Sequence, residues 1–252
     1  MPGPVVKPYN RSFYNRHVAE SAQSAAAIVP LVLEAVRPRQ VVDVGCGVGA
    51  WLAAFRNQGA DRILGLDGDH VPRDRLLIPV EDFRPFDLAK PVGLDQRFDL
   101  AISLEVAEHL PEAGAADFVA LLTRLSDIVL FSAAIPGQGG DGHVNEQWQS
   151  YWAALFAAHD YRPIDCIRPR VWRDPRVQWW YTQNTLLYVS GTVLERLSAL
   201  RDLAAAYAHI PLDLVHPRRY LLDSTSSEIS VRRAGRLFSG ALRRWAAQRG
   251  IR

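Results

Sequence analysis

The segment Gln40–Gln58 constrains the fold of this chain more than any other part of the sequence. An apolar run, Gln40–Val44, leads into a turn with glycine at every second position, and a helical pattern, Ala50–Gln58, follows. The turn glycines are Gly45, Gly47 and Gly49. Glycines permit tight turning and close approach of a ligand. A turn before a helix also presents free N–H groups and the positive end of a helix dipole. The segment therefore predicts a ligand-binding strand, turn and helix.

Further apolar runs and helical patterns alternate after this unit. Strands are expected at Gln40–Val44, Arg62–Leu66, between Leu76 and Phe86, and at Phe98–Leu104, Ile128–Ser132, Arg162–Arg168 and Gln183–Val189. Helices are expected at Ser12–Val36, Ala50–Gln58, Glu112–Leu125 and Gln147–His159. Alternation of this kind predicts an α/β fold, a doubly wound and mostly parallel sheet covered on both faces. The last two strands lack a long helix between them, which suggests an antiparallel edge hairpin.

The bulk composition fits a soluble, cytoplasmic protein. The 252 residues are 48% hydrophobic and 22% charged, as in ordinary globular domains. The net charge of +2 by itself neither favours nor excludes nucleic acid, and we expect no nucleic-acid partner. Two cysteines are too few for a disulfide framework. Charged residues interrupt the apolar stretches, so we expect no stable membrane insertion.

Three segments are expected along the chain. Residues 1–37 form a lead and a helical lid, 38–190 the ligand-binding core, and 191–252 a helical extension. Ile229–Trp245 in the extension is expected to form a basic amphipathic helix, with arginines beside an apolar face. Such a helix packs on its own domain or across a homodimer interface, and the alternative is docking on a partner or an anionic membrane surface.

Asp43, directly before the turn, discriminates between two possible cofactors. The glycine pattern alone also fits a dinucleotide, and Asp67 after the second strand would accept hydrogen bonds from the ribose of either cofactor. A carboxylate at Asp43 would repel a pyrophosphate but balance the ammonium and sulfonium of S-adenosylmethionine. The residues therefore favour S-adenosylmethionine over a nicotinamide cofactor.

Three motifs in order resemble those of class I S-adenosylmethionine-dependent methyltransferases: Asp43–Gly49, Gly65–Asp67 and Phe98–Leu110. The resemblance implies a Rossmann-like seven-stranded sheet whose last strand is antiparallel. It also implies that the turn, with Gly45, Cys46, Gly47 and Gly49, contacts the methionine part of the cofactor, and that Asp67 holds the ribose. An acid with an apolar neighbour after the third strand would hold the adenine. Asp87 with Leu88 is the preferred pair, and Asp82 with Phe83 the competing one.

Two residues after the fourth strand are candidates for contacts in the site. Glu105 follows the strand directly, where a parallel sheet opens toward its ligand, and is assigned to the cofactor. A helix-cap role is the alternative. His109 lies four residues further on and is a candidate general base, although a structural role is equally compatible with the sequence.

The acceptor is expected at the loop Ala133–Trp148 after the fifth strand. The loop is rich in glycine and ends in a cluster of polar residues, as functional loops often do. Its candidate catalytic residues are His143, Asn145 and Glu146; the alternative is a capped helix start. Tyr181, in Trp179–Asn184, is a further candidate because aromatic faces stabilise cations, and Asn184 is weighed with it. Tyr14 in the expected lid is assigned to the cofactor.

The sequence thus predicts methyl transfer to a small polar metabolite. The acceptor side also resembles uncharacterised bacterial methyltransferases of glycan or secondary-metabolite assembly, which implies a sugar-type or other small-molecule acceptor. Two alternatives remain open: intramolecular cyclisation of S-adenosylmethionine with release of methylthioadenosine, and a non-catalytic cofactor-binding or scaffold protein. The spacing of histidines and carboxylates matches no local metal motif, so no metal is expected.

Overall fold

The structure is a computed structural model that describes residues 11–88 and 96–225, with side chains described for 18–88 and 96–221. The chain divides into two compact units, Met1–His216 and Pro217–Arg252. The first unit contains the whole sheet and all the loops of the candidate site. Of the second unit, the structure describes α9 (Pro217–Thr225). The basic helix expected at Ile229–Trp245, and dimerisation through it, lie outside the described residues.

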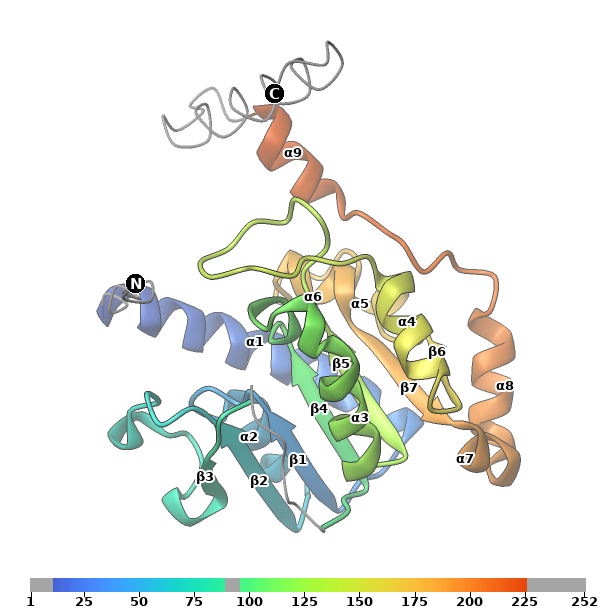
Figure 1. The fold of residues 1–252 in the computed structure, drawn as a ribbon, viewed down its shortest axis with the longest axis horizontal. Helices are drawn as coiled ribbons and strands as arrows, with labels where there is room; N and C mark the ends of the chain where they lie inside the picture. Colours follow the sequence, from blue (N-terminus) through green and yellow to red (C-terminus); the bar gives the residue numbers. More distant parts are fainter. Residues whose placement is uncertain (1–10, 89–95, 226–252) are drawn as a thin grey trace. The chain divides into compact units, whose positions relative to one another are not determined.

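A seven-stranded sheet with the order β3-β2-β1-β4-β5-β7-β6 lies at the centre of the first unit (Figure 1). The strands are β1 (Gln40–Val44), β2 (Arg62–Asp67), β3 (Phe83–Pro85), β4 (Leu100–Leu104), β5 (Ile128–Ser132), β6 (Tyr161–Ile164) and β7 (Leu186–Ser190). The strands β1 to β5 pair in parallel, whereas β7 is antiparallel to both β5 and β6. The predicted Rossmann-like sheet with an antiparallel last strand is confirmed.

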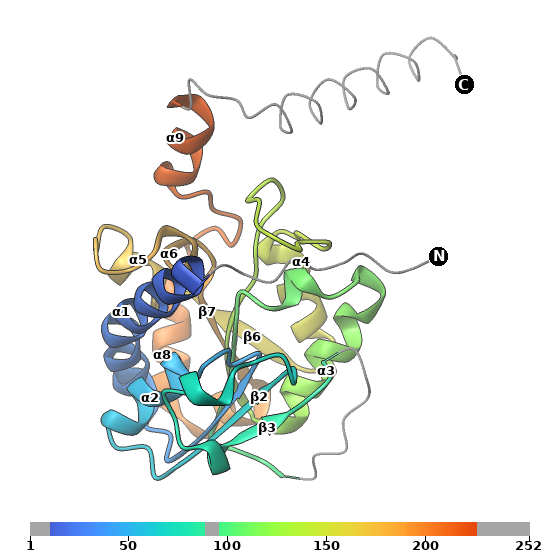
Figure 2. The same cartoon turned by 90° about the vertical axis from the view of Figure 1, so that its left-hand side faces the viewer.

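Helices cover both faces of the sheet (Figure 2). One face is covered by α1 (Arg11–Ala35), α2 (Ala50–Asn57), α7 (Gly191–Arg196) and α8 (Ser198–Tyr207). The other face is covered by α3 (Ala115–Leu125) and α4 (Gln149–Ala157). All residues of β4, β5 and β7 are buried between these layers. Burial on both faces explains why these strands are continuous apolar runs without alternation.

The helix α1 is a core helix over its described side chains. Ile28, Val29 and Val32 are fully buried and belong to the same hydrophobic cluster as α2. The window Val18–Ala35 has a mean hydropathy of 1.2 and is long and apolar enough to cross a membrane by length and composition. The window contains two acidic residues, Glu20 and Glu34, and its buried side chains pack on the domain. A lid role for residues 11–17 stays a prediction.

Two predicted strand segments are wrong at their boundaries. Trp179–Asn184 forms the helix α6, and β7 begins at Leu186. Aromatic residues favour strands on average, but tertiary packing overrides this tendency. Likewise β6 ends at Ile164, and the chain continues into the short helix α5 (Arg168–Val171). The expected antiparallel pairing of the last two strands is confirmed, with these two helices between them.

The turn between β6 and α5 is fixed by a buried ion pair. Arg168 donates two hydrogen bonds to Asp165, at 2.9 and 2.7 Å, and further ones to the carbonyls of Gln183, Pro211 and Leu212. Both charged side chains are almost fully buried. Arg168 therefore joins the last two strands to the segment that follows α8.

Candidate active site

The carboxyl ends of β1, β2, β4 and β5 meet at one edge of the sheet. Asp43 pairs with Gly65 in the neighbouring strand, and Leu104 at the end of β4 pairs with Ser132 at the end of β5. Every polar residue that the sequence singled out after these strands therefore lies along the same edge. Ligands of open α/β sheets bind in this position.

The glycine turn packs too tightly for side chains at two of its positions. Gly45 has a φ of 86°, and a Cβ there would lie 2.4 Å from Cγ2 of Val106. Gly49 has a φ of 83°, and a Cβ there would lie 2.9 Å from Cγ1 of Ile78. Gly47, in contrast, faces open space within the described part of the chain. The turn thus has no room for a side chain at Gly45 or Gly49, whereas the Cβ position of Gly47 is open.

Asp67 at the end of β2 reaches across to this turn. Its Oδ2 accepts the N–H of Gly47 at 2.6 Å, and its Oδ1 accepts the N–H of Gly68 at 2.6 Å. Its side chain is 14% exposed. The carboxylate is therefore held in one orientation at the mouth of the turn.

Asp43 lies beneath the turn and is 2% exposed. Burial raises the pKa of this carboxyl group well above its usual range, and the nearby charge of Asp67 raises it further. A cation bound at the glycine turn would favour the ionised form of Asp43. Cys46 is also buried, and its thiol donates to the carbonyl of Gly47 at 3.4 Å. Burial raises the pKa of this thiol, which is therefore unreactive.

The two acids considered for the adenine lie at opposite ends of β3. Asp87 and Leu88 follow the strand, at the same edge as Asp67, whose carbonyl accepts the N–H of Phe86 at 2.7 Å. Asp82 precedes the strand and lies 3.6 Å from a guanidinium nitrogen of Arg56. The position of Asp87 is compatible with the predicted contact, whereas Asp82 faces a basic side chain.

Glu105, directly after β4, has a strained backbone and a well-defined set of partners. Its φ is 57°, and its N–H donates to the carbonyl and hydroxyl oxygens of Ser132. Its carboxylate accepts one hydrogen bond from Gln138 at 2.8 Å and one from Asn184 at 3.0 Å. Burial raises the pKa of Glu105, and these hydrogen bonds oppose that shift. A non-glycine residue in this conformation is retained only where the surroundings fix it.

An amide network extends from Glu105 to the last strand. Oε1 of Gln138 accepts hydrogen bonds from Asn184 at 3.0 Å and from Gln183 at 3.1 Å. Gln183 also donates to Oδ1 of Asn184 and accepts the N–H of His216. Gln138, Gln183 and Ser132 were not among the residues predicted from the sequence. The two glutamines could have been found as amides in the loop after β5 and shortly before the last strand, whereas Ser132 lies within the apolar run of β5.

The loop after β5 lies directly against the segment after β4. The N–H groups of Val144 and Asn145 donate to the carbonyl of Glu108, at 2.9 and 3.0 Å. This contact brings the rings of His143 and His109 together, edge to face, with their centres 4.9 Å apart. Enclosure lowers the pKa of His109, and the charge of His143 lowers it further.

Glu146 orients His143. Nδ1 of His143 lies 3.0 Å from Oε1 of Glu146, and the same carboxylate accepts the N–H groups of Gly137 and Gly139, at 2.7 Å each. The loop thus folds around one carboxylate, which fixes the histidine. Glu108, which the sequence analysis passed over, lies beneath His143, with Oε1 at 3.9 Å from Nε2.

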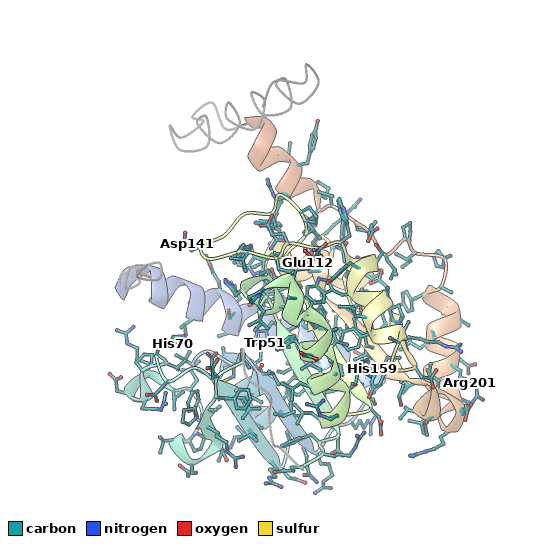
Figure 3. All side chains as sticks on the ribbon, in the orientation of Figure 1. Trp51, His70, Glu112, Asp141, His159 and Arg201 are labelled. Carbon is teal, nitrogen blue, oxygen red and sulfur yellow. The ribbon has the colours of Figure 1, made fainter. Side chains whose placement is uncertain are left out.

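The remaining candidates lie deeper. Asn145 is 3% exposed; its Oδ1 accepts from Gln147, and its Nδ2 has no hydrogen-bond partner among the described residues. Tyr181 is buried against Trp51 at the start of α2, which Figure 3 labels, and its hydroxyl lies 3.1 Å from that of Ser21. Burial raises the pKa of Tyr181 to about 12. The side chain of Tyr14 lies outside those that the structure describes.

The fold and the acid-lined glycine turn define an S-adenosylmethionine-dependent methyltransferase of class I. In agreement, residues 14–186 match a family described as Methyltransferase domain, which covers more than half of the chain. The protein belongs to this methyltransferase family, whose methyl donor is S-adenosylmethionine.

Two curated relatives are bacterial ubiquinone biosynthesis O-methyltransferases. The one from Rhodopseudomonas palustris (strain BisA53) is 30% identical over 139 residues, covering 51% of this chain and 49% of the relative. The one from Methylobacterium sp. (strain 4-46) is 34% identical over 97 residues, covering 36% and 37%. The chain therefore matches about half the length of these relatives or less.

Solved methyltransferases share the fold. Magnesium protoporphyrin IX methyltransferase from Synechocystis PCC 6803, with bound S-adenosylhomocysteine, is 18% identical with a TM-score of 0.53, covering 74% of this chain and 90% of that chain. A sugar N-methyltransferase from Streptoalloteichus sp. ATCC 53650 is 16% identical with a TM-score of 0.55, covering 75% and 96%. The cyclisation and scaffold alternatives receive no support from these proteins.

Proposed function

We propose that this protein transfers the methyl group of S-adenosylmethionine to an oxygen or nitrogen atom of a small polar acceptor. The main support for this proposal is the pair of hydrogen bonds that the loop after β5 donates to the carbonyl of Glu108. It places His143 and Glu146 beside the segment that starts at Glu105, at the edge of the sheet that also holds the glycine turn. This geometry supports a single site in which polar side chains face the acceptor and the glycine turn holds the cofactor. The names of the O-methyltransferase relatives and of the sugar N-methyltransferase support an oxygen or nitrogen acceptor atom.

In this proposal the cofactor lies along the carboxyl ends of the first four strands in sheet order. Asp67 accepts hydrogen bonds from the ribose, and Asp87 with Leu88 contacts the adenine. The turn Gly45–Gly49 holds the methionine part, and the buried charge of Asp43 balances its ammonium. Glu105 lies next in line, at the methyl-bearing end.

The reaction is an in-line displacement. The acceptor atom forms a bond to the methyl carbon while the carbon–sulfur bond breaks, and sulfur takes the bonding electron pair to give S-adenosylhomocysteine. A sulfonium is a good leaving group, so the protein contributes mainly by orienting the reactants in an enclosed site. The residues facing the acceptor in this arrangement are His109 and His143, with Asn145 and Glu146 behind them. Tyr181 and Trp51 enclose the site from the side of α1.

The acceptor is a small molecule, for example a sugar-type or other secondary metabolite, and the site of action is the cytoplasm. Membership of the methyltransferase family alone determines neither the acceptor nor the site of action. The O-methyltransferase names of the relatives and the polar lining of the acceptor side support the first. The packing of α1 into the core of the domain supports the second.

A binding and product assay tests the proposal. S-adenosylmethionine affinity is measured by calorimetry, and labelled cofactor is then incubated with the protein, with and without pools of sugars and phenolic metabolites. We expect binding, and S-adenosylhomocysteine formation only when an acceptor is present. Methylthioadenosine formed without any acceptor would instead establish cyclisation. Binding without turnover in any pool would favour the scaffold alternative, and an Asp43→Ala variant that binds as tightly as the wild type would contradict the proposed cofactor site.

A further inference from the structure

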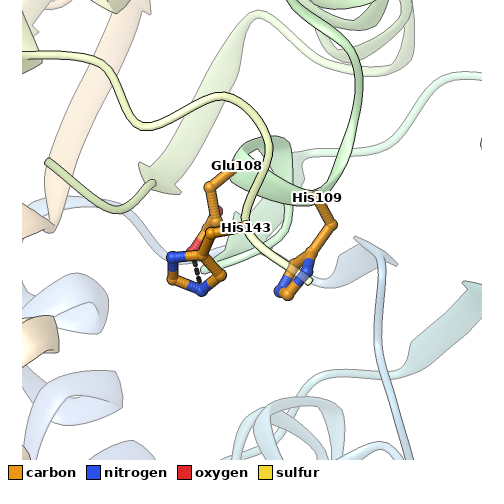
Figure 4. A group of neighbouring side chains, drawn as sticks. All are labelled: Glu108, His109 and His143. Carbon is orange, nitrogen blue, oxygen red and sulfur yellow. Dashed lines mark ion pairs between the residues drawn. The ribbon is translucent and has the colours of Figure 1, made fainter. Parts of the chain in front are cut away.

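Three potential metal ligands converge at the acceptor side of the site (Figure 4). They are Glu108 and His109, from the turn after β4, and His143, from the loop after β5. One ligand atom from each residue lies within 4.8 Å of the others. Glu108 and His109 are adjacent, but His143 lies 34 residues further along the chain, so no local spacing predicts the group. The expectation that no metal is present rested on local spacing alone.

A second observation points to a cation at this position. Glu108 is fully buried, and among the described residues neither of its carboxylate oxygens makes a hydrogen bond of normal geometry. Nε2 of His143 lies 3.9 Å from Oε1 of Glu108. A buried carboxylate without a partner is unfavourable, and a bound cation removes the cost. Figure 4 shows this side chain directed at the ring of His143.

We propose that Glu108, His109 and His143 bind a divalent transition-metal ion of the Zn²⁺ or Mn²⁺ type. Two imidazole nitrogens and one carboxylate are a common ligand set for such ions and leave positions open for other ligands. Metal–ligand bonds of about 2.1 Å place two ligands of one ion at most about 4.2 Å apart, so the three side chains need to close in only slightly. Calcium and magnesium, which take oxygen ligands, fit this set less well.

The residues around the group support the same assignment. Glu146 holds Nδ1 of His143 at 3.0 Å, which leaves Nε2 directed toward Glu108. A carboxylate that fixes the second nitrogen of a histidine is the usual support for a metal-bound imidazole. The rings of His143 and His109 meet edge to face, so their nitrogens converge without stacking.

This inference rests on the proposed function for its role in the reaction. The metal ion would bind the hydroxyl oxygen of the acceptor and lower the pKa of that hydroxyl. The hydroxyl proton passes to solvent water, and the oxygen then attacks the methyl carbon as the carbon–sulfur bond breaks toward sulfur. The two histidines would hold the ion, and no general base is required at either of them.

Metal binding itself is the test. The full chain, freed of any affinity tag, is stripped with a chelator and titrated with Co²⁺ and Mn²⁺, using visible absorption for the first ion and electron paramagnetic resonance for the second. We expect one ion per chain. His109→Ala, His143→Ala and Glu108→Gln should each weaken binding about tenfold or more. His159→Ala is the matched control, since His159 is exposed beyond α4 (Figure 3).

The outcomes separate this inference from the proposed function. If the wild type binds S-adenosylmethionine and transfers methyl groups but takes up neither ion, the metal site is wrong and the function stands. If the ion binds but the cofactor does not, the function is wrong and the metal site stands. His109 is the most exposed of the three residues, so His109→Ala keeps the test open if Glu108→Gln fails to fold. Unchanged metal affinity in a folded His109→Ala, with methyl transfer reduced, would overturn the proposal in favour of a general base.

Discussion

The backbone N–H of Gly47 donates to Oδ2 of Asp67 at 2.6 Å, which ties the turn after β1 to the end of β2. The second oxygen of the carboxylate is fixed by the N–H of Gly68. Asp67 is therefore oriented by the protein itself, before any ligand arrives. Such preorganisation reduces the entropy lost when a ribose binds.

Replacing Asp67 by Asn should weaken S-adenosylmethionine binding by roughly ten- to a hundredfold. The amide keeps one oxygen but loses the charge, and its NH₂ group faces the N–H of Gly47 or Gly68; hydrogen bonds to charged groups are the stronger ones. Isothermal calorimetry measures the change. Asp69→Asn is the control, because Asp69 is 90% exposed and pairs with Arg73. Equal losses in both variants would contradict the ribose assignment.

Asp43→Asn should stabilise the cofactor-free protein at neutral pH and weaken cofactor binding. The folded-state pKa of Asp43 is raised by burial and by Asp67. The native state therefore retains a proton that the unfolded state has lost, so this group's contribution to stability falls as pH rises from its unfolded pKa toward the raised one. Asparagine removes that dependence.

Denaturant unfolding of wild type and Asp43→Asn across this pH range measures the effect. The difference in the free energy of unfolding should grow with pH and favour the variant. A constant difference would show that Asp43 is ionised in the cofactor-free protein. In calorimetry, wild-type binding of the cationic cofactor should release a proton, and the variant should not.

Gly45→Ala should destabilise the domain by about 2–4 kcal/mol, from overpacking and from a left-handed backbone. The new Cβ would lie 2.4 Å from Cγ2 of Val106. Chemical unfolding measures the loss, and the double variant Gly45→Ala/Val106→Ala should recover the overpacking part. Gly114→Ala is the control, since Gly114 has an ordinary negative φ and open space around it within the described residues. A loss of similar size at Gly114 would contradict the steric explanation.

Arg168→Ala should cost about 3–5 kcal/mol, because it leaves Asp165 buried without its partner. Arg168 is fully buried and also bonds the carbonyls of Pro211 and Leu212. Arg176→Ala removes an exposed pair with Asp174 and should change thermal unfolding little, since solvent screens such pairs. If both variants unfold alike, the ion pair does not anchor the segment after α8.

The cofactor half of the site was predictable because its signals are local. Asp43 and the turn glycines are contiguous, and Asp67 follows the next strand, so sequence order alone determines that they meet. The preference for Asp87 over Asp82 stays a prediction, and the sequence places it less firmly because β3 is short and has exposed residues. Hydrophobic patterning is weakest for such an edge strand.

The acceptor half depends on contacts between distant segments. His109 and His143 were selected separately, but their approach depends on two hydrogen bonds from the loop to the carbonyl of Glu108. Backbone hydrogen bonds between distant loops cannot be predicted from the pattern of side chains. Glu108 was not selected because the sequence alone does not distinguish a buried acid in a short turn from an acid on the surface.

The reversed direction of β7 has a consequence for how such a protein diversifies. Asn184 ends α6, just before β7, yet it donates to Glu105 after β4, because an antiparallel strand begins where its parallel neighbours end. The stretch from β6 to β7 therefore delivers side chains to the proposed acceptor side without passing through the glycine turn. If the acceptor binds where we propose, substitutions or insertions in that stretch should change what is methylated and leave the proposed donor site intact. Directed evolution toward new acceptors should therefore begin between Trp172 and Asn184, beyond the buried Asp165–Arg168 pair.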